Sequence, residues 1–367
     1  MIQISNIKIR KDISDTKLFE TIIKKYKIEP KDVVEWHISR KSIDARKKDD
    51  IHYIYSIDLK LKNENKYKKF NKVKEFNIPK IKAINTDIKN VVIVGAGPSG
   101  LFSALTLVQN GSSPIVIEQG ESVESRKISV DKFLKNGNLN VLSNVQFGEG
   151  GAGTFSDGKL TTGINSPYCK KVLQEFVNFG APEQILYLSK PHIGTDNLIN
   201  IIKNIRNYII SKGGSFLFNT KVVDFNIING KIISVSCLNN GNLQEISASH
   251  VVLAIGHSSR DTFEKLYEKG INMEKKNFSV GVRIEHLQEE INKSQYGSFT
   301  NLKLPPAEYK LAYHSPNTGR SCYTFCMCPG GVVMASSSEK NTIVSNGMSN
   351  FLRNGKNANS ALLVNVV

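Results

Sequence analysis

The segment that most constrains the fold of this chain is residues 90–118, in which a strand pattern, a glycine-rich turn and a helix pattern follow one another directly. Residues 91–94 (VVIV) are β-branched throughout, which is typical of a central parallel strand covered on both faces. Residues 95–100 (GAGPSG) form the turn, residues 101–109 have helical character, and the apolar run 114–117 closes on Glu118. This order predicts an α/β fold with a doubly wound, Rossmann-like parallel sheet.

The turn carries three glycines with the GxGxxG spacing, at Gly95, Gly97 and Gly100. Gly95 permits the tight turn, Gly97 lets the backbone approach a pyrophosphate, and Gly100 lets the helix lie close to the strand. The N–H groups at the start of the helix add the positive end of the helix dipole. We therefore expect a dinucleotide to bind along the whole turn, which consists of Gly95, Ala96, Gly97, Pro98, Ser99 and Gly100.

Glu118 follows the second strand, 18 residues after Gly100. A carboxylate at this place is suited to accept hydrogen bonds from both hydroxyls of an adenosine ribose, and it repels a 2′-phosphate. The pattern thus favours NAD or FAD over NADP. A glycine-rich turn without a ligand is the alternative.

The region after residue 218 favours FAD over NAD. Residues 229–230 and 240–241 are both Asn-Gly, which suits tight hairpin turns, so a β-meander is expected there. Residues 251–256 then return as a buried strand that ends in Gly256, the layout of flavin-binding domains with such a glycine near the dinucleotide. Arg126, eight residues beyond Glu118, is placed to bridge to the phosphates; the alternative is a solvated helix residue.

A second glycine cluster covers residues 148–159 and contains five glycines within eleven residues. Such a loop exposes many backbone N–H groups and can follow a flat anionic ligand closely. We expect Gly150, Gly151, Gly153 and Thr154 of this loop to lie against the flavin ring or the ribityl chain. A long flexible connection is the alternative.

Catalytic candidates follow these motifs in the chain. His257 comes directly after the strand that should end near the cofactor, where a histidine can donate a proton or serve only as a structural hydrogen-bonding group. Cys326 and Cys328, with Cys322 close by, are candidates for a redox relay beside the flavin, and small buried core cysteines are the favoured alternative. Three sulfurs with no further ligand make a poor zinc site, so we predict no metal.

The length and the charge of the chain limit its possible domain organisation. The 367 residues allow two or three domains, and we expect a small basic α+β domain over 1–80, a linker over 81–89, a FAD-binding core over 90–277 and a β-rich substrate-side region over 278–367. The net charge of +16 comes largely from residues 1–90, which hold 23 basic and 13 acidic residues. Because 40 of the 49 basic residues are Lys, we attribute this excess to compositional drift more than to phosphate recognition.

Longer segments carry a family resemblance that covers nearly the whole chain. They are SIDARK (42–47), SNVQFGEGGAGTFSDGKL (143–160), KPHIGTDNL (190–198), LAIGHSSRDTFE (253–264), FSVGVRIEH (278–286), YTFCMCPGGVV (323–333), NGMS (346–349) and NANSALLV (357–364). These segments resemble a family of bacterial flavoproteins known as FAD-dependent dehydrogenases or NAD(P)/FAD-dependent oxidoreductases. The resemblance implies FAD binding in a core like two dinucleotide folds with a small N-terminal domain, and it implies no established substrate.

The chain departs from that family at its C-terminal end. Members of the family continue further, and flavoproteins of this architecture usually supply a late Gly-Asp segment that closes over the flavin. This chain has no Gly-Asp pair and stops in the apolar run 362–367. We therefore expect it to lack the C-terminal part of the family's members.

Together these patterns predict a cytoplasmic FAD-dependent oxidoreductase, a dehydrogenase that moves a hydride between the flavin and a small organic substrate, with NAD(P)H as a candidate electron donor. No apolar run approaches the roughly 18 residues of a membrane-spanning helix, so no membrane partner is expected. One alternative is a flavin-containing RNA-associated protein that uses the basic N-terminal domain, although no RNP-like aromatic motif is present. Another is a non-catalytic dinucleotide-binding fragment.

Overall fold

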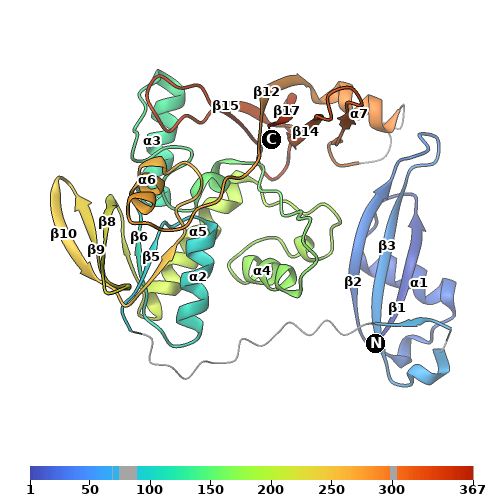
Figure 1. Cartoon of the computed structure of the whole chain (residues 1–367). Coiled ribbons are helices and arrows are strands. Elements are labelled where there is room, and N and C mark those ends of the chain that lie inside the picture. The colour runs from blue at the N-terminus through green and yellow to red at the C-terminus, as the bar shows by residue number, and fades with distance from the viewer. Residues whose placement is uncertain (68, 74–88, 298–303, 367) are drawn as a thin grey trace.

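The computed structural model describes residues 1–67, 69–73, 89–297 and 304–366. Figure 1 shows an N-terminal sheet with its helix in blue, a central α/β unit, and a C-terminal β-rich unit in orange and red. Residues 81–88 of the expected linker lie outside the described residues. In the described part of the chain, no helix combines the length and apolar character needed to cross a membrane.

The N-terminal unit is an antiparallel sheet, in the order β2-β3-β1-β4, with one helix packed on it. Ile2 and Ile4 of β1 are buried because alternate strand residues point to the same face. They belong to one cluster with Leu18 and Ile22, which share a helix face at a spacing of four residues. The elements are β1 (Ile2–Ile9), α1 (Asp15–Tyr26), β2 (Val33–Asp44), β3 (His52–Leu61), β4 (Asn71–Lys72) and the short 3-10 turns Pro30–Asp32 and Glu64–Tyr67.

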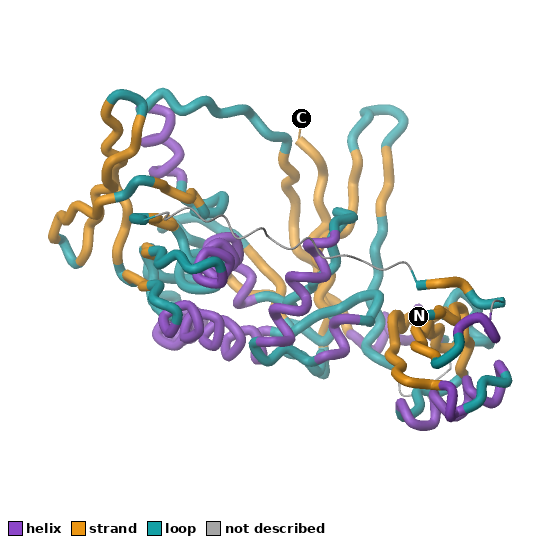
Figure 2. Tube along the Cα trace, turned by 90° about the horizontal axis from the view of Figure 1, so that it is seen from below, coloured by secondary structure: helices purple, strands orange, loops and turns teal. Residues whose placement is uncertain are grey.

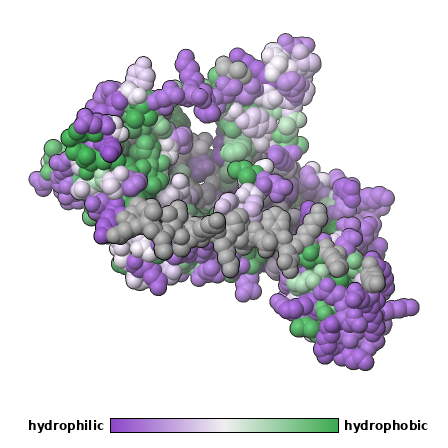
Figure 3. All heavy atoms as spheres, turned by 60° about the horizontal axis from the view of Figure 1, so that its bottom comes forward, coloured by the Kyte–Doolittle hydropathy of each residue, from purple (hydrophilic) through white to green (hydrophobic). Residues whose placement is uncertain are grey.

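Backbone hydrogen bonds attach the N-terminal unit to the central unit. The Lys41 N–H donates to the Tyr187 carbonyl at 2.8 Å, and the Ser189 N–H donates to the Lys41 carbonyl at 2.9 Å. Through these bonds, Lys41 of β2 forms one parallel bridge with Leu188, which lies outside the N-terminal sheet. Hydrophilic side chains cover most of the surface that this unit shows in Figure 3, where it lies at the lower right.

A parallel sheet in the order β11-β5-β6-β7 forms the middle of the central unit. All four side chains of β5 are buried, as expected for a strand covered on both faces. This confirms the predicted α/β fold with a Rossmann-like sheet. The strands are β5 (Val91–Val94), β6 (Ile115–Ile117), β7 (Ser215–Leu217) and β11 (His250–Leu253).

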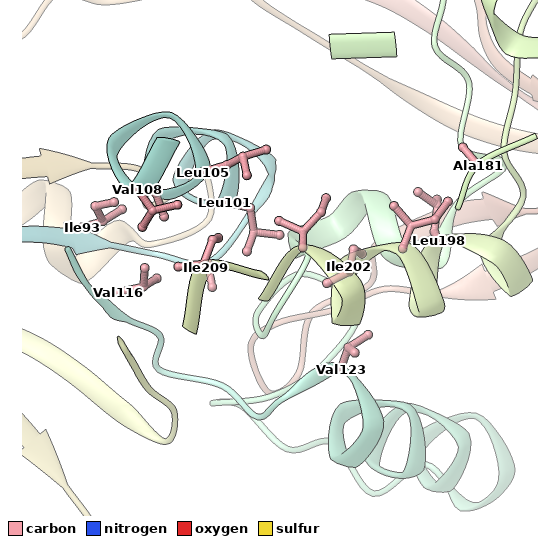
Figure 4. Close-up of a cluster of buried hydrophobic side chains, with 14 of the residues drawn as sticks. Ile93, Leu101, Leu105, Val108, Val116, Val123, Ala181, Leu198, Ile202 and Ile209 are labelled. Atoms are coloured by element: carbon pink, nitrogen blue, oxygen red, sulfur yellow. The ribbon is translucent and has the colours of Figure 1, made fainter. Parts of the chain in front are cut away.

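Alternate residues of β5 pack into two different layers, because successive side chains point to opposite faces. Ile93 belongs to a cluster with Leu101 of α2 and Ile209 of α5, the helices on one face (Figure 4). Val92 and Val94 instead belong to a cluster with residues of the meander on the other face. The helices are α2 (Pro98–Gln109), α3 (Val123–Asn136), α4 (Pro167–Asn178), α5 (Thr195–Ser211) and α6 (Arg260–Glu268), with 3-10 turns at Gly151–Phe155 and Glu183–Leu186.

The predicted β-meander is present as three antiparallel strands in the order β10-β9-β8. These strands are β8 (Thr220–Ile228), β9 (Lys231–Asn239) and β10 (Asn242–Ser247). Both residues of each Asn-Gly pair have positive φ angles, with Asn229 at 50° and Gly230 at 74° in the first turn. This backbone conformation is the one that tight two-residue hairpins require.

The C-terminal unit is a third antiparallel sheet, in the order β12-β17-β14-β13, with a separate two-stranded ribbon. Figure 2 shows its long strands running side by side near the C-terminal end. Two hydrogen-bonded pairs connect this unit to the central unit: the buried Arg353 guanidinium donates to Asp157, and the half-buried Gln146 amide donates to the Ser336 carbonyl at 2.6 Å. Its elements are β12 (Phe278–Leu287), α7 (Gln288–Tyr296), β13 (Ala312–His314), β14 (Ser321–Cys328), β15 (Val332–Ala335), β16 (Ser345–Met348) and β17 (Asn357–Val366).

Candidate functional site

A cavity of about 560 Å³ lies at the carboxyl ends of β5, β6 and β11, which is where ligands bind in open α/β sheets. The glycine-rich turn, the second glycine loop and the segment after β11 all contribute to its wall. Of the residues that the sequence singled out, the cavity brings together Gly95, Gly97, Pro98, Ser99, Glu118, Gly151, Gly153, Gly256 and His257.

Gly95 and Gly100 have the close backbone contacts that the spacing of the turn predicted. Gly95 has a φ of 102°, and a Cβ there would collide with the Ala254 carbonyl after β11. A Cβ at Gly100 would collide with the Gly95 carbonyl and lie 3.4 Å from Ile93, so only glycine lets α2 start this close to β5. At Gly97 a Cβ would meet only the Gly151 Cα, at 3.8 Å, an ordinary van der Waals contact, and both glycines line the cavity.

Ala96 contributes to the turn through its backbone and not through the cavity wall. Its N–H donates to a Glu118 carboxylate oxygen at 2.8 Å, and its carbonyl accepts from the Gly150 N–H at 2.8 Å. The first N–H groups of α2, which begins at Pro98, have no acceptor within a helix and form the positive end of its dipole. The turn therefore presents donors to an anionic ligand.

Glu118 lines the cavity but has already committed most of its carboxylate to the backbone. One oxygen accepts from the N–H groups of Gly120 and Gly148 at 2.9 and 3.0 Å, and the other accepts from Ala96. A carboxylate has about four lone-pair positions, so about one is left for a ribose hydroxyl. The sequence predicted bonds to both hydroxyls, and the arrangement favours one.

Arg126 corrects the sequence prediction of a phosphate contact. Its side chain has no exposed surface and lies behind the second glycine loop. The guanidinium donates to the carbonyls of Asn144, Glu149 and Val145 at 2.8, 2.6 and 2.9 Å, and it stacks over the Phe155 ring at 4.9 Å. Burial lowers the pKa of Arg126 to about 10, so it stays charged at neutral pH. Arg126 is therefore a loop-organising residue, and the alternative of a solvated helix residue is also wrong.

The second glycine loop is divided between the cavity and the interior. Gly151 and Gly153 line the cavity as predicted. Gly150 instead packs on Ile202 of α5, with a φ of 83°. Thr154 is fully buried, and its carbonyl accepts from the Thr195 hydroxyl at 2.6 Å. Gly150 and Thr154 therefore support the loop from the protein interior, whereas the sequence predicted that they lie against the flavin.

A buried carboxylate lies beside Arg126. Glu149 accepts from the Val123 N–H at 2.8 Å and pairs with Arg206 at 2.7 Å, while its other oxygen has no partner among the described residues. Burial outweighs the effect of Arg206 and raises the pKa of Glu149 to about 7. These contacts hold the start of α3 and the second glycine loop together.

The catalytic candidates fall in two places. His257 lies on the cavity wall with an exposed side chain, 3.5 Å from the Ser258 hydroxyl. Cys326 and Cys328 lie in the C-terminal unit and are not part of the cavity wall. Lys159, at the end of the second glycine loop, donates to the carbonyl of Met327 between them. The two cysteines thus adjoin the loop but not the cavity described here.

Several cavity residues were missed by the sequence patterns. Gln146 donates to Ser336 and accepts from the Ser258 hydroxyl, so it links the cavity wall to the C-terminal unit. Thr220 and Lys221 follow β7 at the same carboxyl edge of the sheet, a position that the topology alone would have indicated. Other cavity residues that the sequence patterns missed include Gln119, Phe147, Thr262 and Phe263.

Comparisons with protein families match three consecutive parts of the chain. Residues 89–286 match the model described as pyridine nucleotide-disulphide oxidoreductase, and residues 277–367 match the FAD-dependent protein, C-terminal domain-like model. Residues 1–60 match a domain of unknown function, DUF8436. A relative from Clostridium beijerinckii, described as an uncharacterized protein, is 47% identical over 375 residues that cover 100% of this chain and 69% of the relative.

Solved structures with partial similarity include several flavoproteins. The glycerol-3-phosphate dehydrogenase from Bacillus halodurans, complexed with FAD, is 13% identical and covers 75% of this chain and 51% of its own, with a TM-score of 0.36. A flavoprotein/dehydrogenase from Cytophaga hutchinsonii is 14% identical, with coverages of 75% and 55% and a TM-score of 0.35. THI4 from Thermovibrio ammonificans is 17% identical, with coverages of 50% and 64% and a TM-score of 0.34.

The present chain thus spans between about half and two thirds of the length of these three solved chains. With TM-scores below 0.5, they do not bear on its activity. The family models and the relative from Clostridium beijerinckii agree with the resemblance that the sequence motifs carried, and they do not favour an RNA-associated protein. The chain belongs to a family of FAD-dependent oxidoreductases that contains the pyridine nucleotide-disulphide oxidoreductase domain.

Proposed function

We propose that this chain binds FAD in the cavity at the carboxyl edge of the central sheet and transfers a hydride between the flavin and a small organic substrate. The observation that carries the proposal is the pair of glycine loops that face each other across this cavity. A Cβ at Gly97 would already contact the Gly151 Cα at 3.8 Å, so a larger side chain there would fill the space between the two backbones that line the cavity. Such a space fits a pyrophosphate.

Different residues of the cavity would bind different parts of the cofactor. The start of α2 offers N–H donors to the phosphates, and the remaining lone pair of Glu118 accepts from a ribose hydroxyl. Gly153, which lies beside Pro98 on the cavity wall, lets a flat ring approach the backbone. FAD, when bound, supplies a two-electron hydride acceptor or donor. His257 is the cavity residue suited to hold a proton for the substrate.

Flavin retention tests the first half of this proposal. The chain, purified and incubated with FAD, should elute from gel filtration with bound flavin, and Gly97→Val should elute without it. Circular dichroism checks that the variant stays folded; its Cβ makes an ordinary contact with the Gly151 Cα at 3.8 Å. Gly163→Ala is the matched control, since nothing lies within 4 Å of a Cβ there. Equal flavin content in the wild type and Gly97→Val would refute the cavity assignment.

The electron donor is tested separately. We propose NAD(P)H as the donor, because residues 89–286 match the model described as pyridine nucleotide-disulphide oxidoreductase. Anaerobic addition of NADH or NADPH to the FAD-loaded chain should bleach the flavin absorbance. If neither nucleotide bleaches it and a chemical reductant does, NAD(P)H is not the donor, while the FAD assignment stands.

A further inference from the structure

Cys326 and Cys328 lie at a break in the regular pairing of β14 with β17. Phe325 pairs with Ala361 and Cys328 with Asn359, so three steps along β14 correspond to two along its partner. This is a β-bulge, in which one strand carries an extra residue. Cys326 adopts a left-handed φ of 45°, which is uncommon for a residue other than glycine and costs on the order of 1 kcal/mol or more.

The bulge brings the two thiols together. The Cys328 thiol donates to the Cys326 carbonyl at 3.3 Å, and each cysteine shifts the pKa of the other. Both cysteines are free. Gly347 closes the site from β16, because a Cβ there would lie 2.7 Å from the Cys328 sulfur. The strand thus presents a paired dithiol in place of two separate core cysteines.

Positive charges surround this dithiol. Lys159 donates to the Met327 carbonyl between the two cysteines, and Arg283 donates to the Cys326 carbonyl at 3.3 Å. The hydrogen bond from Cys328, with these two cations, lowers the pKa of Cys326 to about 6 against the opposing effects of burial and Asp157. The same interaction raises the pKa of Cys328, which is also buried. One sulfur is therefore suited to be a thiolate while the other keeps its proton.

The two sulfurs also differ in access. Cys328 has no exposed surface, and Cys326 is partly exposed. An accessible thiolate next to a buried thiol is the arrangement in which the first sulfur attacks and the second resolves. We propose that Cys326 and Cys328 form a redox centre that exchanges two electrons with a disulfide substrate. This inference requires no flavin and so stands or fails independently of the proposed FAD site.

The exchange balances in two steps. The Cys326 thiolate attacks one sulfur of a disulfide R–S–S–R, that bond breaks, and one RS⁻ leaves and takes up a proton. Cys328 then loses its proton and attacks the Cys326 sulfur of the mixed disulfide, which releases the second thiol and forms the Cys326–Cys328 bond. The protein dithiol is oxidised by two electrons, and the disulfide is reduced to two thiols.

The test follows the thiols of the full chain by mass. The reduced protein is equilibrated with mixtures of reduced and oxidised glutathione, blocked with N-ethylmaleimide and cleaved with trypsin. Residues 321–340 form one tryptic peptide that holds Cys322, Cys326 and Cys328. We expect this peptide to carry one maleimide, on Cys322, and an internal Cys326–Cys328 disulfide that dithiothreitol reverses.

Two variants identify the roles of the sulfurs. Cys328→Ser should accumulate glutathione on Cys326, because the resolving thiol is gone, and Cys326→Ser should accumulate none. Cys169→Ser serves as the matched control with an unchanged profile. Cys326 should also react with iodoacetamide at pH 7 roughly tenfold faster than an unperturbed thiol. Three maleimides on the peptide at every glutathione ratio, in a chain that circular dichroism shows to be folded, would overturn the proposal.

Discussion

Replacing Arg126 with Met tests whether this residue organises the second glycine loop. The change keeps the length of the side chain and removes the donors to four carbonyls, those of Asn144, Val145 and Glu149 at 2.6–2.9 Å and that of Gly148 at 3.3 Å. Each buried acceptor left without a donor costs about 1–3 kcal/mol. The variant also avoids the cost of burying the Arg126 cation, which is several kcal/mol, and this gain offsets part of the loss. We expect a net loss of about 3 kcal/mol in the free energy of unfolding.

Urea denaturation followed by circular dichroism measures this loss, and hydrogen exchange locates it. Protection should fall first for the amides of residues 144–154. Lys127→Ala is the matched control, because Lys127 is the next residue of the same helix and its side chain is exposed. This change should alter stability by less than about 0.5 kcal/mol. If Arg126→Met instead unfolds at the wild-type urea concentration and only loses FAD, Arg126 is a cofactor contact and the structural argument is wrong.

Two further changes follow from the same site. Gly100→Ala forces a Cβ against the Gly95 carbonyl and should lower the melting temperature, whereas Gly163→Ala should not; equal melting temperatures would contradict the packing argument. Burial raises the pKa of Glu149 from 4.5 to about 7, so the stability this group contributes is complete below about pH 4.5 and is lost as the pH rises through about 7. Urea midpoints at pH 5 and pH 8 should show the wild type losing stability relative to Glu149→Gln, and parallel midpoints would refute the shift.

The central fold was predictable from local pattern. A run of four β-branched residues, 91–94, needs cover on both faces, and the GxGxxG spacing fixes where the strand ends and the helix begins. The Asn-Gly pairs marked both hairpins because few other residue pairs tolerate positive φ at two successive positions. In each case the information lies within a few residues of the feature that it specifies.

Long-range contacts were not predictable in the same way. The residues next to Arg126 in the sequence predict only a helix. Arg126 becomes a buried hydrogen-bond donor because residues 144–149 fold back against α3. Likewise, the spacing of Cys326 and Cys328 did not reveal their pairing, because that depends on a bulge set by β17, more than 30 residues later. A sequence pattern indicates which groups are present, and the partner strand or loop decides what they contact.

The glycine content of the two loops has a second cause that the cofactor alone does not explain. The Glu118 carboxylate gathers three backbone N–H groups, from Ala96, Gly120 and Gly148, around one point. Chains can converge on a carboxylate this closely only where Cβ atoms are absent: one at Gly120 would lie 2.6 Å from the Gly148 Cα. Arg126 gathers the carbonyls of Asn144 and Val145, just before the second glycine loop, and that of Glu149 within it. Buried charges therefore set the loop backbone before any ligand arrives, and a ligand in the cavity meets a surface that is already shaped.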